Sequence, residues 1–331
     1  MSELAYRQNR KHRLRNPSTL VLIVLNVVVY FFLLRWVREN IHAEKLADYV
    51  MRIPVWALLG SLLIHLLALV LYGVRMSVLL GRDFRTAFSI INAGYALNTL
   101  LPLRVGEGIK LYFGHRLFAV PLTGVFTASV AEKLIDLVMI LLFGSMVLAF
   151  AAGGIIQAST LISAGVVTLI AVGIVILFRR NVVRVVRFFP RGSRLRRISI
   201  ALHKHSKEYR VMPIVSATLG IWILTVALIF FTFNTYLPEL RIGLIDAIAL
   251  LVVIALAIAI PSAPAGIGLF EAAVVAFLTQ RTHIGNEAAL AAASVFHLVI
   301  SLPQVMLTAW LVWRRPAWRS PKSLCPSSEL K

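Results

Sequence analysis

The chain has 331 residues, of which 59% are hydrophobic and only 15% are charged. A soluble domain of this size would carry about 25% charged residues, so the composition excludes a soluble globular protein and indicates a polytopic membrane protein. The formal net charge of +20 does not indicate a nucleic-acid partner, because the basic residues cluster between apolar runs, as the positive-inside rule expects of cytoplasmic loops.

Residues 1–16 form a basic arm, which we expect to be cytoplasmic. The apolar run 19–34 predicts a first span; it is too long for a signal peptide and lacks a cleavage site, so we interpret it as retained. Residues 38–52 carry balanced charges and predict an outer loop, and 54–80 predict a second span. Near the end of that span, Arg75 either snorkels to the interface or acts as a functional charge within the membrane.

Residues 87–101 are apolar but end at Pro102. As a helix they would reach about 22 Å, which is short of a hydrocarbon core of about 30 Å. The residues that follow are again basic, as far as Arg116. We therefore predict a re-entrant hairpin near 87–116 that enters and leaves the membrane on the cytoplasmic side.

Residues 118–150 and 155–178 predict two further spans, which complete a first membrane half at 17–178. The strongest basic run follows, at 179–211, and apolar residues are interleaved in its first part. We interpret this run as a cytoplasmic connector lying on anionic lipid head groups. A solvated loop is the alternative.

The second membrane half is predicted at 212–315. It contains a span at 213–236, a second re-entrant hairpin near 244–278 and a closing span at 288–313. The hairpin is predicted because proline and glycine interrupt its apolar sequence and the part after the interruption is too short to span. The polar tail, 316–331, is predicted to be disordered and cytoplasmic.

The predicted fold class is thus an all-α polytopic membrane protein with about six full transmembrane helices and two re-entrant broken-helix hairpins. This arrangement places both termini and every basic cluster on the cytoplasmic side of the cell's inner membrane. If both short segments were full spans, the connector and the carboxyl tail would lie on opposite sides. The two halves enter from opposite faces, which predicts an inverted repeat with a binding site at the repeat interface.

Charged and glycine residues gather at the two broken segments and on the span between them. In a membrane protein, helix breaks beside charges mark places where backbone and ions face a cavity rather than lipid. The candidate substrate-binding residues are Arg104, Gly106, Glu107, Lys110, Glu132, Lys133, Asp136, Gly266, Gly268 and Glu271.

These charges admit more than one interpretation. The cations suit a lipid phosphate and the carboxylates a cationic head group, whereas the alternative is that the charges only pair with one another to hold the hairpins. Arg104 offers a planar fork that matches phosphate, with Glu107 as its partner in the empty state. Glu132 and Asp136 lie one turn apart on one helix face, and either is a candidate proton site.

The motifs Pro102-Leu-Arg-Val-Gly-Glu, Glu132-Lys-Leu-Ile-Asp136 and Pro264-Ala-Gly-Ile-Gly-Leu-Phe-Glu271 occur in this order. In their order and spacing the chain resembles the transmembrane region of lysylphosphatidylglycerol synthase, the multiple-peptide-resistance flippase domain, over roughly residues 15–315. The resemblance implies movement of modified lipids across the membrane, with the synthase activity in a separate soluble domain that we expect to be absent here.

The resemblance carries over to eight of the candidate residues and fails at two other positions. Lys133 and His297 stand where the family typically has arginine. Lysine keeps the charge but loses the fork geometry, and histidine makes the charge depend on pH. The matched positions are Arg104, Gly106, Glu107, Glu132, Asp136, Gly266, Gly268 and Glu271.

We therefore predict a flippase-like transporter of a polar or modified lipid, such as a phospholipid, aminoacyl-lipid, glycolipid or isoprenoid-type lipid. The alternatives are a secondary transporter of a small anionic or amphipathic solute, or a membrane accessory subunit of a lipid-modifying enzyme. The sequence has no Walker loop, no Gly-x-Ser-x-Gly and no His/Cys cluster, and its one cysteine is Cys325. We accordingly expect no enzyme activity, cofactor, metal or nucleic-acid partner. Membrane lipids are the expected partners, with a lipid-modifying enzyme as a further candidate; the sequence does not specify an oligomeric state.

Overall fold

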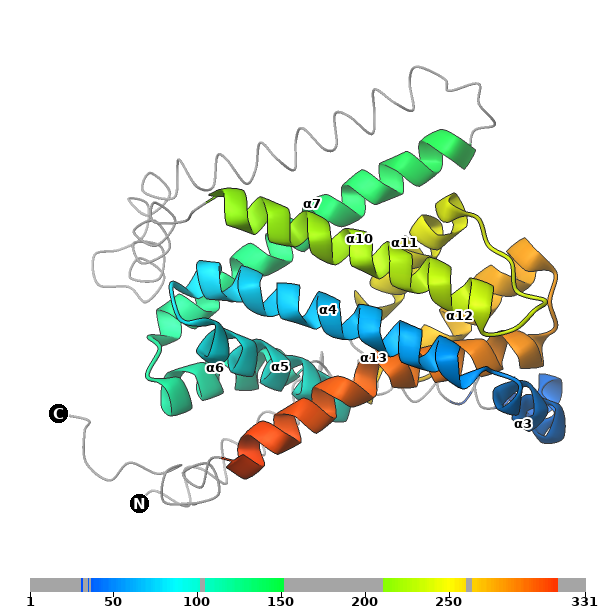
Figure 1. Ribbon diagram of the computed structural model, residues 1–331, viewed down its shortest axis with the longest axis horizontal. Coiled ribbons are helices and arrows are strands. Elements are labelled where there is room, and N and C mark those ends of the chain that lie inside the picture. The colour runs from blue at the N-terminus through cyan, green and yellow to red at the C-terminus, as the bar shows by residue number, and fades with distance from the viewer. Residues whose placement is uncertain are drawn as a thin grey trace.

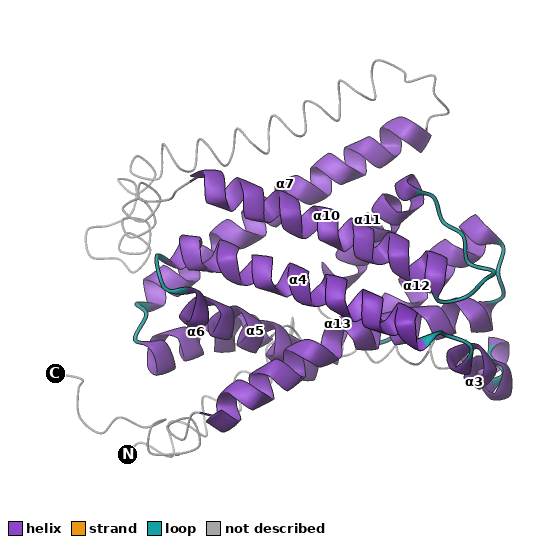
Figure 2. Cartoon of the chain, in the orientation of Figure 1, coloured by secondary structure: helices purple, strands orange, loops and turns teal. Residues whose placement is uncertain are grey.

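The computed structural model describes residues 31, 35, 37–101, 105–151, 211–259 and 264–314 (Figure 1). All regular structure in these residues is helical (Figure 2), which confirms the predicted all-α class. The helices are α3 (Ala43–Met51), α4 (Val55–Leu80), α5 (Phe84–Leu100), α6 (Val105–Phe118), α7 (Leu122–Ala151), α10 (Val211–Thr235), α11 (Leu244–Ala259), the short 3₁₀ helix η2 (Pro264–Gly266), α12 (Leu269–Thr282) and α13 (Asn286–Arg314).

Four of the described helices, α4, α7, α10 and α13, are long and apolar enough to cross a membrane. They correspond to four of the six predicted full spans, so the chain is a multi-pass membrane protein. The other two predicted spans, at 19–34 and 155–178, lie outside the described residues. The basic arm, the connector up to residue 210 and the tail lie outside them as well.

The segment 38–52, predicted as a loop, contains the helix α3. The charge balance behind that prediction concerns the side of the membrane, which stays a prediction, and says nothing about backbone conformation. The sequence of α3 has no proline or glycine and begins with the strong helix formers alanine, glutamate, lysine and leucine. α3 packs against α13, and His42 at its start lies 3.0 Å from Glu287 at the start of α13.

The boundaries of α4 and α5 follow from local sequence. Pro54 precedes the first residue of α4 with an extended backbone, and Gly81 ends the helix with a φ of 59°, the left-handed conformation that glycine adopts without strain. Asp83 then caps α5 by accepting a hydrogen bond of 3.0 Å from the backbone N–H of Thr86. That bond is the main reason why the pKa of Asp83 lies below its ordinary value. The cap starts α5 at Phe84, three residues before the predicted start.

The two predicted hairpins correspond to two pairs of short helices. α5 packs against α6, and α11 packs against α12. α5, the longest of these four, has 17 residues, and a helix of that length reaches about 26 Å, less than the hydrocarbon core. Residues 102–104 and 260–263, where the two pairs are interrupted, lie outside the described residues. The re-entrant path and the inverted repeat stay predictions.

The two halves of the chain are joined by several helix contacts, among them α4 with α10 and α5 with α13. α4 and α10 run side by side (Figure 1), and glycines allow their close approach: a Cβ at Gly60 would lie 2.6 Å from the ring of Phe231, and one at Gly220 would lie 2.6 Å from Leu71. In addition, η2 lies against α5. The second broken segment is therefore in contact with the helix that leads into the first.

The ends of the bundle differ in charge, and this generates a topology prediction. Arg82 follows α4 at the end of the bundle where α13 also terminates (Figure 1), whereas Lys45 lies in α3 at the opposite end. Both residues are exposed. In a Cys325→Ser background, Lys45→Cys should react in intact cells with an impermeant thiol reagent, and Arg82→Cys should react only after permeabilisation, because basic loops stay inside. Labelling of Arg82→Cys in intact cells would refute the predicted orientation.

Candidate functional site

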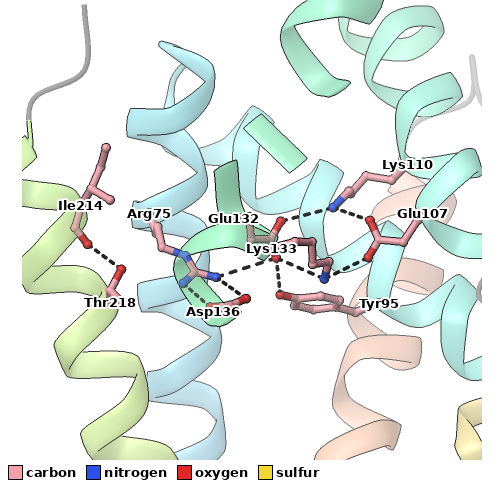
Figure 3. Close-up of polar contacts among 9 residues, drawn as sticks. All are labelled: Arg75, Tyr95, Glu107, Lys110, Glu132, Lys133, Asp136, Ile214 and Thr218. Carbon is pink, nitrogen blue, oxygen red and sulfur yellow. Dashed lines mark hydrogen bonds and ion pairs between the residues drawn. The ribbon is translucent and has the colours of Figure 1, made fainter. Parts of the chain in front are cut away.

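In the described part of the chain, six charged side chains gather between α4, α6 and α7 (Figure 3). Tyr95 of α5 completes the group by bonding to one of the carboxylates. The group, called the charge cluster below, consists of Arg75, Tyr95, Glu107, Lys110, Glu132, Lys133 and Asp136. It brings together five of the ten predicted site residues, from segments up to 61 residues apart in the sequence.

Helix periodicity places the cluster's members on facing sides of their helices. Glu107 and Lys110 are three residues apart on α6. Glu132 and Asp136 are four residues apart on α7, so they share one face, as predicted. α7 packs against both α4 and α6, which brings the cations of those helices to the carboxylates of α7.

Arg75 binds Asp136 with both branches of its guanidinium. Nη1 donates to Oδ1 at 2.7 Å and Nη2 donates to Oδ2 at 3.2 Å, the two-pronged geometry that distinguishes arginine from lysine. The Arg75 side chain is 1% exposed, and its guanidinium lies 5.2 Å from the centre of the Tyr72 ring. The snorkelling interpretation of Arg75 is therefore wrong, because its charge is compensated inside the bundle and has no need to reach the interface.

Glu132 lies at the centre of the cluster and is fully buried. Its Oε1 accepts a hydrogen bond of 2.8 Å from the Tyr95 hydroxyl and lies 3.8 Å from Arg75. Its Oε2 accepts a bond of 3.3 Å from Lys110 Nζ. A buried carboxylate with this set of donors is satisfied, so Glu132 ties α4, α5 and α6 to α7.

The cluster has a buried layer and a half-exposed layer. Arg75, Lys110 and Glu132 are 0–1% exposed, whereas Lys133 is 49%, Glu107 31% and Asp136 22% exposed. Three cations face three carboxylates, so the cluster is neutral as a whole, the arrangement that a low-dielectric interior tolerates best.

The outer pair consists of Glu107 and Lys133. Lys133 Nζ lies 3.1 Å from Glu107 Oε1, 3.9 Å from Glu132 and 6.0 Å from the centre of the Tyr95 ring. Glu107 also meets Lys110 Nζ at 2.8 Å through its other oxygen. Arg104, the predicted partner of Glu107, lies outside the described residues.

Gly106 has a packing role in this structure. A Cβ built on it would lie 2.5 Å from the backbone nitrogen of Asn98 and 2.5 Å from the carbonyl oxygen of Gly94. Any larger residue would push the start of α6 away from α5. Gly106 thereby lets α5 and α6 lie close together. Each of these helices carries a side chain, Tyr95 or Lys110, that bonds to Glu132.

The three candidates in the second broken segment, Gly266, Gly268 and Glu271, lie apart from the charge cluster, beside an ionisable pair that Glu271 forms with His297. Gly266 and Gly268 have φ values of 74° and 89°, which glycine adopts readily, and they form the turn before α12. The backbone N–H of Gly268 donates to Glu271 Oε2 at 2.6 Å. Glu271 Oε1 lies 2.6 Å from Nδ1 of His297 on α13. Glu271 thus pairs with His297.

The predicted site residues omit two members of the charge cluster: Tyr95, and Arg75, for which a functional charge was one of two interpretations. An arginine within an apolar span is itself a functional signal, and it was available for Arg75. Nothing in the sequence marks Tyr95, whose role depends on the contact between α5 and α7. Among the described residues, no group of three or more His, Cys, Asp and Glu side chains is placed to hold a metal ion.

Comparison with known proteins gives one result that covers most of the chain. The family model described as the lysylphosphatidylglycerol synthase TM region matches residues 23–307. A comparison with curated proteins gives no match. The matched region includes every member of the charge cluster and the Glu271–His297 pair.

The burial of Arg75 generates a stability prediction. Arg75→Ala leaves Asp136 and Glu132 without the guanidinium and should lower the free energy of unfolding by roughly 3–5 kcal/mol. Arg75→Ala/Asp136→Ala removes one charge of each sign and should recover part of that loss. Unfolding of the purified protein in detergent measures both effects. Arg82→Ala, in an exposed loop, is the control and should change the free energy by less than about 0.5 kcal/mol.

A different result would contradict the assignment of Arg75 as the counter-ion. Arg75→Ala would then be as stable as the unmodified protein, or the double variant would lose the sum of the two single losses.

Proposed function

The chain belongs to the lysylphosphatidylglycerol synthase TM region family, and on that basis we propose that it is a flippase-like transporter that moves a lipid with a polar head group across the membrane. The match covers the transmembrane region and no catalytic domain, so the proposal is transport rather than lipid synthesis. The proposed location is the cytoplasmic membrane, with both termini inside.

The observation that carries the proposal is the half-exposed Glu107–Lys133 pair above a buried, satisfied layer. A lipid phosphate can replace Glu107 as the partner of Lys133, and a cationic group on the same head can replace Lys133 as the partner of Glu107. A head group that brings both charges leaves the cluster neutral, so the exchange places no uncompensated charge among the helices.

A groove elsewhere on α5 also suits a lipid. A groove of about 430 Å³ lies between α5 and α13, on the helix that carries Tyr95. Its lining is almost entirely apolar, which suits an acyl chain that stays in hydrocarbon while the head group is bound. The lining residues are Ala96, Leu97, Leu100, Val305, Thr308, Ala309 and Trp313.

Replacing the outer lysine tests this proposal. In proteoliposomes, Lys133→Gln should slow the movement of fluorescent phosphatidylethanolamine by more than about tenfold, because the phosphate loses its cation. Lys133→Arg, which keeps the charge, should retain most of the rate. Both variants should unfold near the temperature of the unmodified protein, because Lys133 is half exposed. Bleaching of the fluorophore by external dithionite measures the rate.

An exposed ion pair elsewhere provides the matched control. Arg52 Nη2 lies 2.6 Å from Glu239 Oε1, with both side chains about as exposed as Lys133. Arg52→Gln should leave lipid movement unchanged. Lipid movement at the normal rate by Lys133→Gln would rule out the head-group role. Uptake of a labelled small anion without lipid movement would favour the solute transporter instead.

A further inference from the structure

A second buried ionisable pair lies apart from the charge cluster. His297 of α13 and Glu271 of α12 approach to 2.6 Å, with side chains only 8% and 15% exposed. The ring of Phe270 stacks on the imidazole, with centroids 4.2 Å apart. His297 belongs to the apolar stretch Asn286–Leu311, which is long enough to cross the membrane. A histidine–carboxylate pair in that environment is a functional candidate by default.

The charge of this pair depends on one proton. When the imidazole is protonated, it and the Glu271 carboxylate form a neutral ion pair with a short, charge-assisted hydrogen bond. When the imidazole is neutral, the carboxylate remains as a single charge among apolar helices, which is unfavourable. The contact of 2.6 Å between Nδ1 and the carboxylate gives a proton on the imidazole an anionic partner, so the geometry suits a proton-binding pair.

Glu271 also caps the start of α12, so the ionisable pair is bonded to the backbone of the second broken segment. Its second oxygen accepts the backbone N–H of Gly268 at 2.6 Å, directly after the left-handed turn of the broken segment. That segment includes η2, which lies against α5, and α5 carries Tyr95 of the charge cluster. Contiguous packed elements therefore connect Glu271 with the charge cluster.

The other ionisable groups around α13 define what could compete for the proton. α13 packs against α3, α4, α5 and α12. From α3, His42 pairs with Glu287 at the start of α13, ten residues before His297. From α12, Arg281 is bound to Asp246. These groups are engaged with partners near the helix ends.

The elements α4 and α5 bring further groups toward the middle of α13. Tyr95 of α5 donates to Glu132, and Arg75 of α4 is bound to Asp136. His65 of α4 is different: it is 7% exposed, its ring contacts the backbone of Ile300 one turn beyond His297, and its Nε2 has no hydrogen-bond partner. An experiment must therefore distinguish proton binding at His297 from proton binding at His65.

We propose that the Glu271–His297 pair is a proton-binding site to which lipid movement is coupled. This inference rests on the proposed lipid transport and adds the coupling ion to it. Proton uptake neutralises the pair, and proton release leaves the Glu271 carboxylate without its counter-charge beside the α12 cap and the broken segment that contacts α5. The lipid and the proton thus act on opposite ends of one connected set of helices.

Lipid movement and proton entry in proteoliposomes test the coupling. With fluorescent phosphatidylethanolamine, the unmodified protein should show rates that differ by about tenfold between about pH 5.5 and about pH 8.5. A pyranine signal inside the vesicles should report proton entry that depends on the presence of the protein. His297→Arg keeps a cation opposite Glu271 at every pH and should move lipid with less than about a twofold effect of pH and without proton entry.

Two variants control for other titrating groups. His283→Asn changes an exposed histidine after α12 whose φ is 57°, a conformation that asparagine tolerates, and should behave like the unmodified protein. Glu271→Gln removes the other member of the pair and should also abolish the pH effect, which keeps the proposal testable if His297→Arg does not fold. The pH effect should persist in His65→Asn.

Two outcomes would overturn the proposal. In the first, the unmodified protein moves lipid at equal rates at both pH values and admits no protons; lipid transport would then stand and the coupling would fall. In the second, the pH effect survives in His297→Arg and disappears in His65→Asn, which would assign the proton to His65. A protein that moves no lipid at any pH would overturn the proposed function and this inference together.

Discussion

The central constraint on this structure is that Glu132, a fully buried carboxylate in a membrane helix, must be compensated from inside the bundle. Its compensation comes from three other helices: a guanidinium from α4, a hydroxyl from α5 and an ammonium from α6. Hydrophobic burial gives little preference for one helix arrangement over another in lipid. The bonds to Glu132 do give such a preference, because a different arrangement would leave charges unpaired.

The same constraint divides the charge cluster into a buried layer that holds the helices together and an outer pair that we propose to bind a head group. The buried layer is satisfied and closed, so exchanging any of its partners would strand a charge. The Glu107–Lys133 pair is half exposed, and Glu107 keeps Lys110 of the buried layer as a second partner through its other oxygen. A lipid head group is the occupant that we propose at that pair, in keeping with the family to which the chain belongs. The Glu271–His297 pair lies next to the broken segment whose helix η2 contacts α5, and it is the proton site that we propose.

Much of this could be predicted from sequence because it depends on neighbouring residues. Pro54, Gly81 and the apolar run between them define α4, and a spacing of four residues places Glu132 and Asp136 on one face. The failures come from long-range contacts. The partner of Arg75 is 61 residues away in the sequence. Snorkelling and burial of Arg75 could therefore not be distinguished without knowing which face of α4 packs against α7. The described partners of Glu107 are Lys110 and Lys133, whereas Arg104, its predicted partner, lies outside the described residues. Tyr95 carries no charge that would mark it.

The most direct test of the account is a structure of the protein in lipid nanodiscs, in which the distance between the Glu107 and Lys133 side chains is measured. The ammonium and the carboxylate oxygen lie 3.1 Å apart in the structure described above. The account predicts that a lipid phosphate lies within about 3.5 Å of the Lys133 ammonium, with the outer pair opened and Arg75, Lys110 and Glu132 unmoved. A closed Glu107–Lys133 pair, with lipid head groups only at the membrane surface in a preparation that moves lipid, would contradict it.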